Sequence, residues 1–375
     1  KLIQISGSEE AKAMIGLTAS QEKQIRQLRH QLHDIAEPSG QEYRTRKLLL
    51  DFLTQETQLD VIDGGEWFYA AYRVPDSDPA RALALRADFD ALFQQDGSAA
   101  HLCGHDGHAA ALCGVALLLP QLKPDRNVFL LFQPAEETGQ GAKACLDLFK
   151  HEQIGRIYGA HNLPGYPLGQ VYTRPGTFAL ASRGLTLRLT GRPAHAAYPE
   201  EGISPAQPIA LLLQKLPELA CNSLTPGQLA LCTVIGLQLG QKAFGQAAAT
   251  AELWLTLRAE TDARLEQMEG AILAEASLQA AAGKLDFAFE RQAVFPATVN
   301  HAAPVQTILA ACQGEYLVDP MRWSEDFGWY LQRCPGAYFG IGAGEQQPAL
   351  HSQDYQYPDS LLQPAVRAFE QLILA

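Results

Sequence analysis

The sequence lacks the features that mark membrane proteins and proteins that bind polyanions. No apolar run approaches the roughly 18 residues that a membrane-spanning helix needs. Residues 1–20 contain no apolar core of the kind found in secretory signal peptides. Acidic residues outnumber basic ones by 41 to 29, and the basic residues form no stripe. These absences argue against a membrane or nucleic acid as a partner.

Paired cysteines and several common catalytic motifs are also missing. The seven cysteines are scattered, and no CxxC pair occurs. An odd, scattered set does not suit a disulfide framework or a structural zinc ribbon, so we expect reduced thiols and a cytoplasmic protein. Neither GxSxG nor HExxH is present. The glycines of residues 340–344 are not followed by a helical pattern, so they do not form a dinucleotide-binding motif.

The residues that are present describe a globular protein, with 47% hydrophobic and 19% charged residues. At 375 residues the chain exceeds the roughly 250–300 at which a single core stops growing, so we expect two domains. Short apolar segments alternate with helical patterns in the first half, at residues 82–87, 127–132 and 156–160. Each segment is apolar on both faces, which predicts an α/β domain with a mainly parallel sheet covered by helices.

One stretch is dense in residue types that bind metals. His101 to His108 contains one cysteine and three histidines. Cys103 and His105 are two residues apart and cannot share a helix face, so we expect both on a loop. The Ala- and Leu-rich run that follows predicts a buried helix ending at Pro120. Taken alone, the stretch fits either half of a metal site or a buried cysteine beside helix-capping residues.

Polar side chains also follow the ends of the predicted strands. Asp88 ends the first strand, Glu136 and Glu137 follow the second, and His161 follows the third. Ligands of open α/β sheets bind at this carboxyl edge. Scattered core histidines or solvated acids would not fall at one edge repeatedly. The pattern therefore favours a metal site.

The second half contains a different pattern. Its predicted elements follow the order β-α-β-β-α-β, which is typical of a ferredoxin-like fold. They are the strand 185–190, the helix 205–219, the hairpin strands 230–239 and 247–258, the helix 261–282 and the strand 285–293. We expect residues 181–293 to form an inserted domain. Residues 1–180 and 294–375 would then be the two parts of a catalytic domain.

Eight motifs occur in a fixed order along the chain. They are Arg86-Ala87-Asp88-Phe89-Asp90-Ala91-Leu92, Cys103-Gly104-His105-Asp106-Gly107-His108, Phe132-Gln133-Pro134-Ala135-Glu136-Glu137, His161-Asn162-Leu163-Pro164-Gly165, the loop from Gly191 to Pro205, Pro296-Ala297-Thr298-Val299-Asn300, Glu325-Asp326-Phe327 and Leu350-His351-Ser352. In this order and on this domain plan, the motifs resemble those of the M20-type metallopeptidases. The resemblance is to the amidohydrolase branch, which contains hippurate hydrolases and auxin–amino-acid conjugate hydrolases.

The resemblance implies a centre of two divalent metal ions, roughly 3.5–4 Å apart. Mixed thiolate, imidazole and carboxylate ligands suit zinc, with manganese, cobalt or nickel as alternatives. Glu136 matches the family's general base, which takes a proton from water and passes it to the leaving amine. The five positions that match the family's metal ligands are Cys103, His105, Glu137, His161 and His351.

Further roles follow from the same resemblance. We expect Asp88 to orient a ligand imidazole, with a structural cap as the alternative. His195 matches a histidine of the inserted domain that stabilises the oxyanion in similar enzymes. Because similar enzymes dimerise through this domain, we expect a homodimer in which His195 serves the partner's site. Arg258 is a candidate for holding a substrate carboxylate, with a surface ion pair as the alternative, and Asn300 is a second candidate for substrate binding.

The expected reaction is metal-dependent hydrolysis of the amide bond of N-acyl amino acids or similar conjugates. One alternative is a di- or aminopeptidase of the same fold. Another is a non-catalytic binding protein on this scaffold, which predicts a lost ligand or base, and none is lost. Substrate preference stays open, because the loop from Phe93 to Ala100 is shorter than in related enzymes. Pro193-Ala194 also replaces the Gly-Gly that is common before the histidine of the inserted domain.

Overall fold

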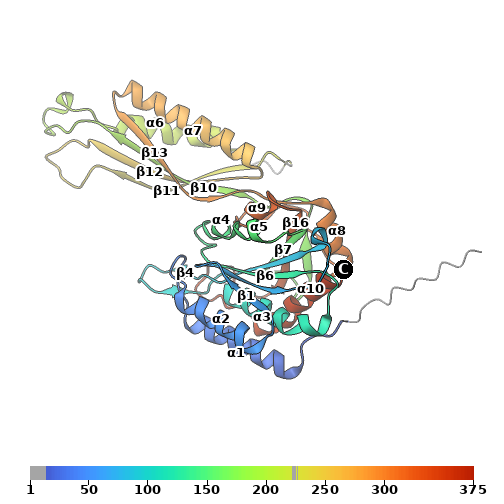
Figure 1. Cartoon of the computed structure of the whole chain (residues 1–375). Helices are drawn as coiled ribbons and strands as arrows, with labels where there is room; N and C mark the ends of the chain where they lie inside the picture. Colours follow the sequence, from blue (N-terminus) through green and yellow to red (C-terminus); the bar gives the residue numbers. More distant parts are fainter. Residues whose placement is uncertain (1–13, 222–224, 226) are drawn as a thin grey trace, which may run out of the picture.

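The computed structural model describes residues 14–221, 225 and 227–375. Figure 1 shows a larger α/β part and a smaller part that projects from one side of it. Most of residues 1–20, where we expect no apolar core of a signal peptide, lie outside the described residues. Within the described residues, no helix combines the length and the apolar character needed to cross a bilayer.

The larger part is built on an eight-stranded sheet with the order β1-β2-β6-β3-β7-β16-β8-β15. Its central strands β6, β3, β7 and β16 are parallel to one another. The pairs β1–β2, β2–β6 and β16–β8 are antiparallel, and β15 is parallel to β8. The mainly parallel α/β sheet is thus confirmed. The strand bounds are β1 Asp60–Asp63, β2 Phe68–Tyr72, β3 Leu83–Asp88, β6 Val128–Gln133, β7 Arg156–Pro164, β8 Val171–Thr173, β15 Glu315–Tyr316 and β16 Gly336–Gly344.

Helices cover both faces of this sheet (Figure 1). One hydrophobic cluster joins the sheet to α1 (Ala19–Asp34), α2 (Tyr43–Glu56), α3 (His105–Leu122), α8 (Ala302–Ala311) and α10 (Leu362–Leu374). A second cluster joins it to the short helices α4 (Gly141–Cys145), α5 (Leu148–His151) and α9 (Gly328–Leu331). Two small ribbons complete this part: β4 (Leu92–Phe93) pairs with β5 (Ala99–Ala100), and β9 (Gly176–Ala179) pairs with β14 (Thr298–Asn300).

Helix α3 lies between the sheet and helices α1 and α10, and residues 105–119 are buried without a break. This agrees with the apolar run in the sequence. The prediction that the helix ends at Pro120 is wrong by two residues, because α3 continues to Leu122. A proline in the last turn removes only its own amide donor, so the helix can run on for two residues before Lys123 adopts a left-handed conformation.

The smaller part is a four-stranded antiparallel sheet with the order β11-β12-β10-β13. Its elements occur in the predicted β-α-β-β-α-β order, and both helices share one hydrophobic cluster with the sheet. We call this part the lid. The elements are β10 Ala181–Thr190, α6 Ala206–Leu219, β11 Ala230–Leu239, β12 Thr250–Ala259, α7 Asp262–Ala282 and β13 Asp286–Phe295. The division at residues 181 and 293 stays a prediction.

Candidate metal centre

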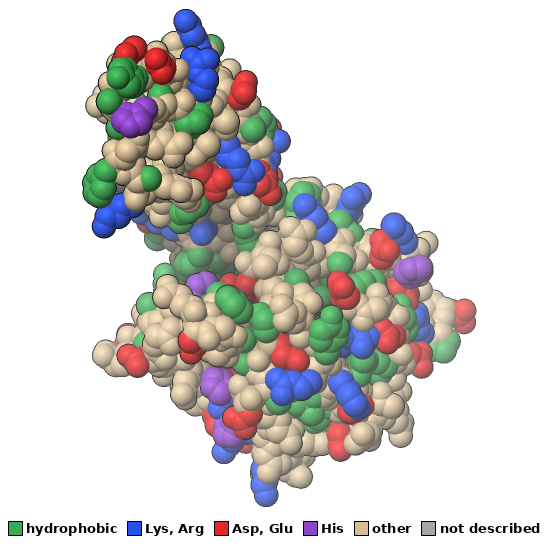
Figure 2. All heavy atoms as spheres, turned by 90° about the vertical axis from the view of Figure 1, so that its left-hand side faces the viewer, with side chains coloured by type: hydrophobic (Ala, Val, Ile, Leu, Met, Phe, Trp, Pro, Cys, Tyr) green, Lys and Arg blue, Asp and Glu red, His purple; other side chains and the backbone are tan. Residues whose placement is uncertain are grey.

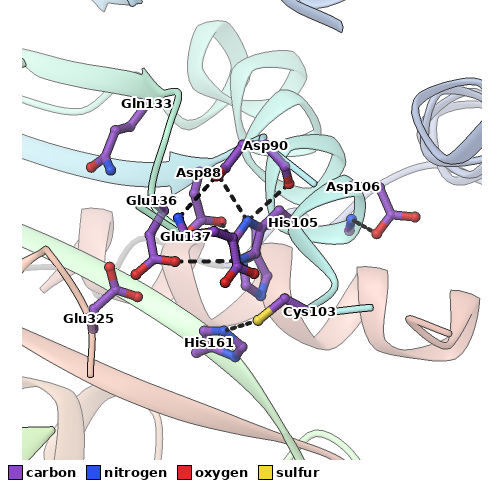
Figure 3. Close-up of polar contacts among 12 residues, drawn as sticks. Asp88, Asp90, Cys103, His105, Asp106, Gln133, Glu136, Glu137, His161 and Glu325 are labelled. Atoms are coloured by element: carbon purple, nitrogen blue, oxygen red, sulfur yellow. Dashed lines mark hydrogen bonds and ion pairs between the residues drawn. The ribbon is translucent and has the colours of Figure 1, made fainter. Parts of the chain in front are cut away.

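The predicted ligands come from separate segments that meet at the carboxyl edge of the large sheet (Figure 3). Cys103 lies on the loop before α3, and Glu137 lies on the loop that follows β6. Two positions differ from the sequence prediction. His105 is the first residue of α3 rather than a loop residue, and His161 lies inside β7, which extends to Pro164. His351 comes from the segment between β16 and α10.

The structure brings all five predicted ligands into two overlapping groups. In the first, one donor atom from each of Cys103, His105 and His161 lies within 4.8 Å of the others. In the second, the same holds for Cys103, Glu137 and His351. Cys103 Sγ is 3.3 Å from His161 Nε2, and His351 Nε2 is 3.7 Å from a carboxylate oxygen of Glu137. The thiol belongs to both groups, so two cations bound here would be neighbours.

Two buried atoms of this cluster indicate that it is built for a cation. His105 Nε2 and Glu137 Oε1 are 3.9 Å apart, and neither has a hydrogen-bond partner among the described residues. Buried polar atoms are rarely left without a partner. His105 Nδ1 lies 3.1 Å from Asp90 Oδ1, so a proton there leaves Nε2 with a free lone pair. Sulfur, nitrogen and oxygen donors in one cluster fit zinc and its neighbours in the first transition series.

Two glycines allow the loop and the start of α3 to pass close to other segments. Gly104 has φ +94°, a left-handed backbone that other residues rarely adopt, and a Cβ there would lie 2.7 Å from Asn162 Oδ1. A Cβ on Gly107 would lie 2.3 Å from the ring of Tyr357. Larger residues at either position would displace the turn that carries Cys103 and His105.

The loop with the paired glutamates is held by two carboxylates that the sequence analysis did not assign. Ala135 has φ +52°, and its amide donates to Glu42 Oε1 at 2.8 Å. The amide of Glu137 donates to Asp90 Oδ2 at 3.0 Å. Both acceptors are buried, and burial raises the pKa of Glu42 to about 7, with the charge of Asp90 adding to the effect. Asp90 could have been noticed because it stands in the first motif, whereas Glu42 carries no local signal.

Glu136 lies beside the ligands, with a carboxylate oxygen 4.0 Å from His105 Nε2, and its carboxylate is also close to that of Glu325 (Figure 3). It is 5% exposed, and its carboxylate forms a close group with those of Glu325 and Asp326. Burial, together with the negative charges of Glu325 and Glu137, raises the pKa of Glu136 well above its usual range. The side chain therefore holds a proton more readily than an exposed glutamate does.

Asp88 has a different partner from the one expected. It is Asp90 that contacts Nδ1 of His105, while Asp88 Oδ1 lies 2.6 Å from Nδ1 of His108. The other carboxylate oxygen of Asp88 accepts a hydrogen bond from Arg86. Although burial opposes it, the positive charge of Arg86 holds the pKa of Asp88 well below its usual range. Asp88 therefore holds His108, which is not a predicted ligand, while its Oδ1 is 4.0 Å from Nε2 of the predicted ligand His105. The expectation that Asp88 orients a ligand imidazole stays a prediction.

His195 is exposed on a loop of the lid. Its ring lies beside that of Tyr198, with the centroids 6.0 Å apart, and its Nδ1 accepts a hydrogen bond from the amide of Ala197 at 3.1 Å. Among the described residues, it belongs to none of the groups of possible metal ligands. Its contacts are with its own loop and, through an isolated β-bridge, with Gln246.

The two predicted substrate residues lie in different surroundings. Arg258, partly buried at the end of β12, donates to Ser324 Oγ at 2.7 Å. Its positive charge contributes to a lowered pKa of His351, after burial and the charge of His105. Asn300 binds the backbone of Tyr338 with both atoms of its amide, and its assignment to substrate binding stays a prediction. Its nitrogen donates to that carbonyl at 2.8 Å, and its oxygen accepts from the amide at 2.7 Å.

The molecule narrows between the lid and the larger part, and its surface is hollowed there (Figure 2). A histidine, acidic side chains and hydrophobic side chains come to the surface close together there. The five donors and Glu136 lie together at the carboxyl edge of the large sheet (Figure 3). This arrangement can hold cations and accept a proton on Glu136.

Comparison with known proteins places the fold and the cluster in one family. The chain belongs to Peptidase family M20/M25/M40, whose model matches residues 84–375. It is 27% identical to N-acetyldiaminopimelate deacetylase of Lacticaseibacillus casei, over 91% of this chain and 94% of that protein. It is 30% identical to the IAA-amino acid hydrolase ILR1-like 4 of Arabidopsis thaliana, over 75% of this chain and 69% of that protein.

A solved structure shares the whole architecture. The YXEP protein of Bacillus subtilis, a dinuclear metal binding peptidase from the M20 family, superposes with a TM-score of 0.79. The match covers 95% of this chain and 98% of that protein at 22% sequence identity. The likeness therefore extends across both the sheet of the larger part and the lid.

Proposed function

We propose that the protein is a dinuclear metal-dependent amidohydrolase. It hydrolyses the amide bond of N-acyl amino acids or similar conjugates and releases a carboxylic acid and an amino acid. The observation that carries the proposal is the cluster of five donor side chains with Glu136 beside it. The relatives support this reaction class, since one is named for deacetylating an N-acetyl amino acid and another for hydrolysing IAA–amino acid conjugates.

The five donors would hold two divalent ions, zinc in first place and manganese, cobalt or nickel as alternatives. When bound, such ions polarise a carbonyl oxygen and lower the pKa of water to near neutrality. Cys103 and His105 are buried, and Asp90 fixes the ring of His105 through its Nδ1. This support keeps the donors in place without the ions. The atoms without partners on His105 and Glu137 support this assignment.

Glu136 acts as the general base. It takes a proton from the attacking water and transfers it to the nitrogen of the leaving amine. Its carboxyl is buried beside Glu325 and Asp326, and this environment favours the protonated form that the second transfer requires. Arg258 of the lid donates to Ser324, which precedes Glu325 of the acidic group around Glu136, and would hold the carboxylate of the amino-acid half, because a guanidinium pairs well with a carboxylate.

His195 would act from a second copy of the chain. Because its Nδ1 accepts the amide hydrogen of Ala197, the neutral ring carries its proton on Nε2 and can donate it to a developing oxyanion. The edge strand β11 supports a homodimer through the lid, since its side chains Val234 and Ile235 are 47% and 61% exposed. Unpaired apolar edges of this kind favour pairing with another copy. All seven cysteines are free, which supports a cytoplasmic location.

The test compares blocked and free substrates. Protein reconstituted with zinc or manganese is assayed on N-acetyl and N-benzoyl amino acids and on dipeptides that end in the same residues. We expect hydrolysis of the N-acyl compounds, two ions per chain by elemental analysis and no hydrolysis by Glu136→Gln. Cleavage of the free dipeptides alone would show a peptidase of the same fold instead.

A further inference from the structure

Three arginines meet at the edge of the large sheet that lies opposite the metal centre. Arg81 precedes β3, Arg126 precedes β6 and Arg156 begins β7, and these strands are neighbours in the sheet. Because β6 and β7 both run parallel to β3, their amino ends lie at one edge. The amide of Arg156 donates to the carbonyl of Ala82, next to Arg81, at 3.1 Å. Residues far apart in sequence are thus held side by side.

The arginines line a cavity of about 230 Å³ at this edge. Its other walls include Tyr158 of β7, Thr307 of α8, and Leu372 and Ala375 at the end of α10. The volume is below the roughly 300–1,000 Å³ that is usual for larger organic ligands. Among the described residues that line the cavity, none is an aspartate or a glutamate. The space therefore suits a small ion or the head group of a small molecule.

Positive charge at the cavity is only partly neutralised. Arg81 forms an ion pair of 2.8 Å with Asp125, and the same carboxylate lies 3.5 Å from Arg126 Nε. Within the described part of the chain, Arg156 forms no ion pair, and the carboxylate of Ala375 pairs with none of the three arginines. The guanidinium groups still outnumber these two carboxylates, although the chain as a whole carries a net charge of −12. Such a local excess of positive charge attracts anions.

A buried hydroxyl group adds an unused donor to the same cavity. Tyr158 is 1% exposed, and its ring packs in the hydrophobic cluster that joins the sheet to α8 and α10. Its hydroxyl makes no hydrogen bond of ordinary geometry with the described residues. Burial raises the pKa of Tyr158, and Thr307 and Arg156, which both line the cavity, counter the rise. An unpaired buried donor costs free energy, and a ligand that accepts its hydrogen would remove that cost.

We propose that this cavity binds a phosphate group, either as inorganic phosphate or as the head group of a small phosphate monoester. Guanidinium groups pair with phosphate oxygens through charge-assisted hydrogen bonds. A phosphate monoester carries close to two negative charges at pH 7, and its three free oxygens point in different directions. They can therefore accept from the arginines and from Tyr158 at once, which a flat carboxylate does less well. The site is separate from the metal centre, which lies at the carboxyl ends of β3, β6 and β7.

The first experiment titrates inorganic phosphate into the metal-loaded protein by calorimetry at constant ionic strength. Phosphate also binds divalent metal ions, so matched variants decide which site is measured. Arg156→Gln should weaken binding by roughly tenfold or more, because it removes charge-assisted hydrogen bonds. Arg264→Gln is the control, since Arg264 lies on α7 of the lid and has no carboxylate partner among the described residues. Equal affinity in both variants would overturn the proposal.

The second experiment uses Tyr158→Phe, which removes only the unpaired hydroxyl. Without phosphate, this variant should be at least as stable as the wild type in urea unfolding, because an unpaired buried group contributes no stability. It should bind phosphate roughly fivefold more weakly, since one hydrogen bond is lost. The stabilisation that phosphate gives should fall accordingly. An equal loss of stability with and without phosphate would assign the hydroxyl a structural role and contradict the proposal.

A third titration identifies the source of the phosphate group. Glycerol 3-phosphate and acetate are compared with inorganic phosphate in the wild type and in Arg156→Gln. Tighter binding of glycerol 3-phosphate assigns the site to phosphate monoesters, and tighter binding of inorganic phosphate assigns it to the free ion. If acetate binds as tightly as phosphate and also depends on Arg156, the cavity accepts small anions in general and the phosphate site is rejected.

Discussion

The donor cluster and the His195 loop differ in how firmly each is held. His105 is fully buried, its ring is fixed by Asp90, and the neighbouring loop is held by Glu42. His195 is exposed, and its ring contacts residues two and three positions along the same loop. Binding groups on the large sheet are thus preorganised within one chain. We expect the lid histidine to need a partner surface or substrate before it becomes part of the site.

The largest effect should come from Glu136, on the preorganised side. Glu136→Gln keeps the size of the side chain but cannot accept a proton, so turnover should fall by roughly 10²–10⁴-fold with metal content near two. Glu137→Gln should instead lose metal, because it removes a donor oxygen. Elemental analysis and steady-state assays on both variants decide between the roles. The reverse pattern would mean that the two glutamates have exchanged functions.

The second effect tests the exposed side. His195→Ala should lower turnover by roughly 10²–10³-fold while metal binding stays intact. Mixing His195→Ala with Glu136→Gln under conditions of subunit exchange should restore activity, since a mixed dimer then contains one complete site. If mixed dimers are shown to form and stay inactive, His195 does not serve the partner's site.

The third effect concerns pH and the support behind the donors. The pKa of Glu42 is raised from 4.5 to about 7 in the folded protein. A raised folded pKa contributes stability that is fully present below pH 4.5 and is lost as the pH rises through 7. The metal-free Glu42→Gln variant cannot ionise there. Between pH 5 and pH 8 it should therefore lose less unfolding free energy than the wild type, by up to roughly 3 kcal/mol. Parallel pH dependences of the two proteins in urea unfolding would contradict the raised pKa of the buried Glu42 carboxyl group.

The fourth effect is on metal affinity. Asp90→Asn removes the negative partner of His105 Nδ1, and such changes behind a ligand typically cost 10–100-fold in affinity. Competition with a chromogenic chelator measures it. Asp51→Asn serves as the control, because that aspartate is exposed and pairs with Lys47 on α2. Equal affinity in the Asp90 and Asp51 variants would show that the support is unnecessary.

The smallest effect should come from Arg258, where the lid meets the centre. Arg258→Gln should raise KM about tenfold for substrates with a free carboxylate, because it removes one charge-assisted contact. Amidated analogues of the same substrates should show no such change. An equal rise in KM for both series would mean that Arg258 acts through its bond to Ser324 rather than on the substrate.

The sequence predicted the parallel sheet and the convergence of its polar strand ends, because both follow from local patterns. Apolar runs define buried strands, and parallel strands bring their carboxyl ends to one edge. The roles of Asp90 and Glu42 were not predicted, because both accept hydrogen bonds from backbone amides of a loop distant in sequence. Such bonds produce no pattern in the spacing of residues along the chain. The contacts of Asn300 with the backbone of Tyr338 could not be predicted, because membership in a motif does not reveal which way an amide faces.

The roles of individual residues in the site were harder to predict from the sequence, for a related reason. Asp88 and Asp90 are two residues apart and chemically identical, so only their hydrogen bonds distinguish which one orients His105. His161 was placed beyond a strand that in fact continues through it. The inserted domain's element order was readable from alternation and amphipathic periods. Whether and how it pairs with a second copy depends on the shape and chemistry of its surface. Local periodicity in the sequence does not reveal that surface.

Strand order has a consequence for synthesis on the ribosome. In the large sheet, β16 lies between β7 and β8, yet it is made only after the whole lid. A nascent chain therefore carries β7 with one open, apolar edge until residue 344 has emerged, and such edges invite aggregation. His351 follows that strand by a few residues. The last strand of the sheet and the last donor therefore emerge at nearly the same time. A truncated or stalled chain would be prone to aggregation and would lack one of the proposed metal ligands.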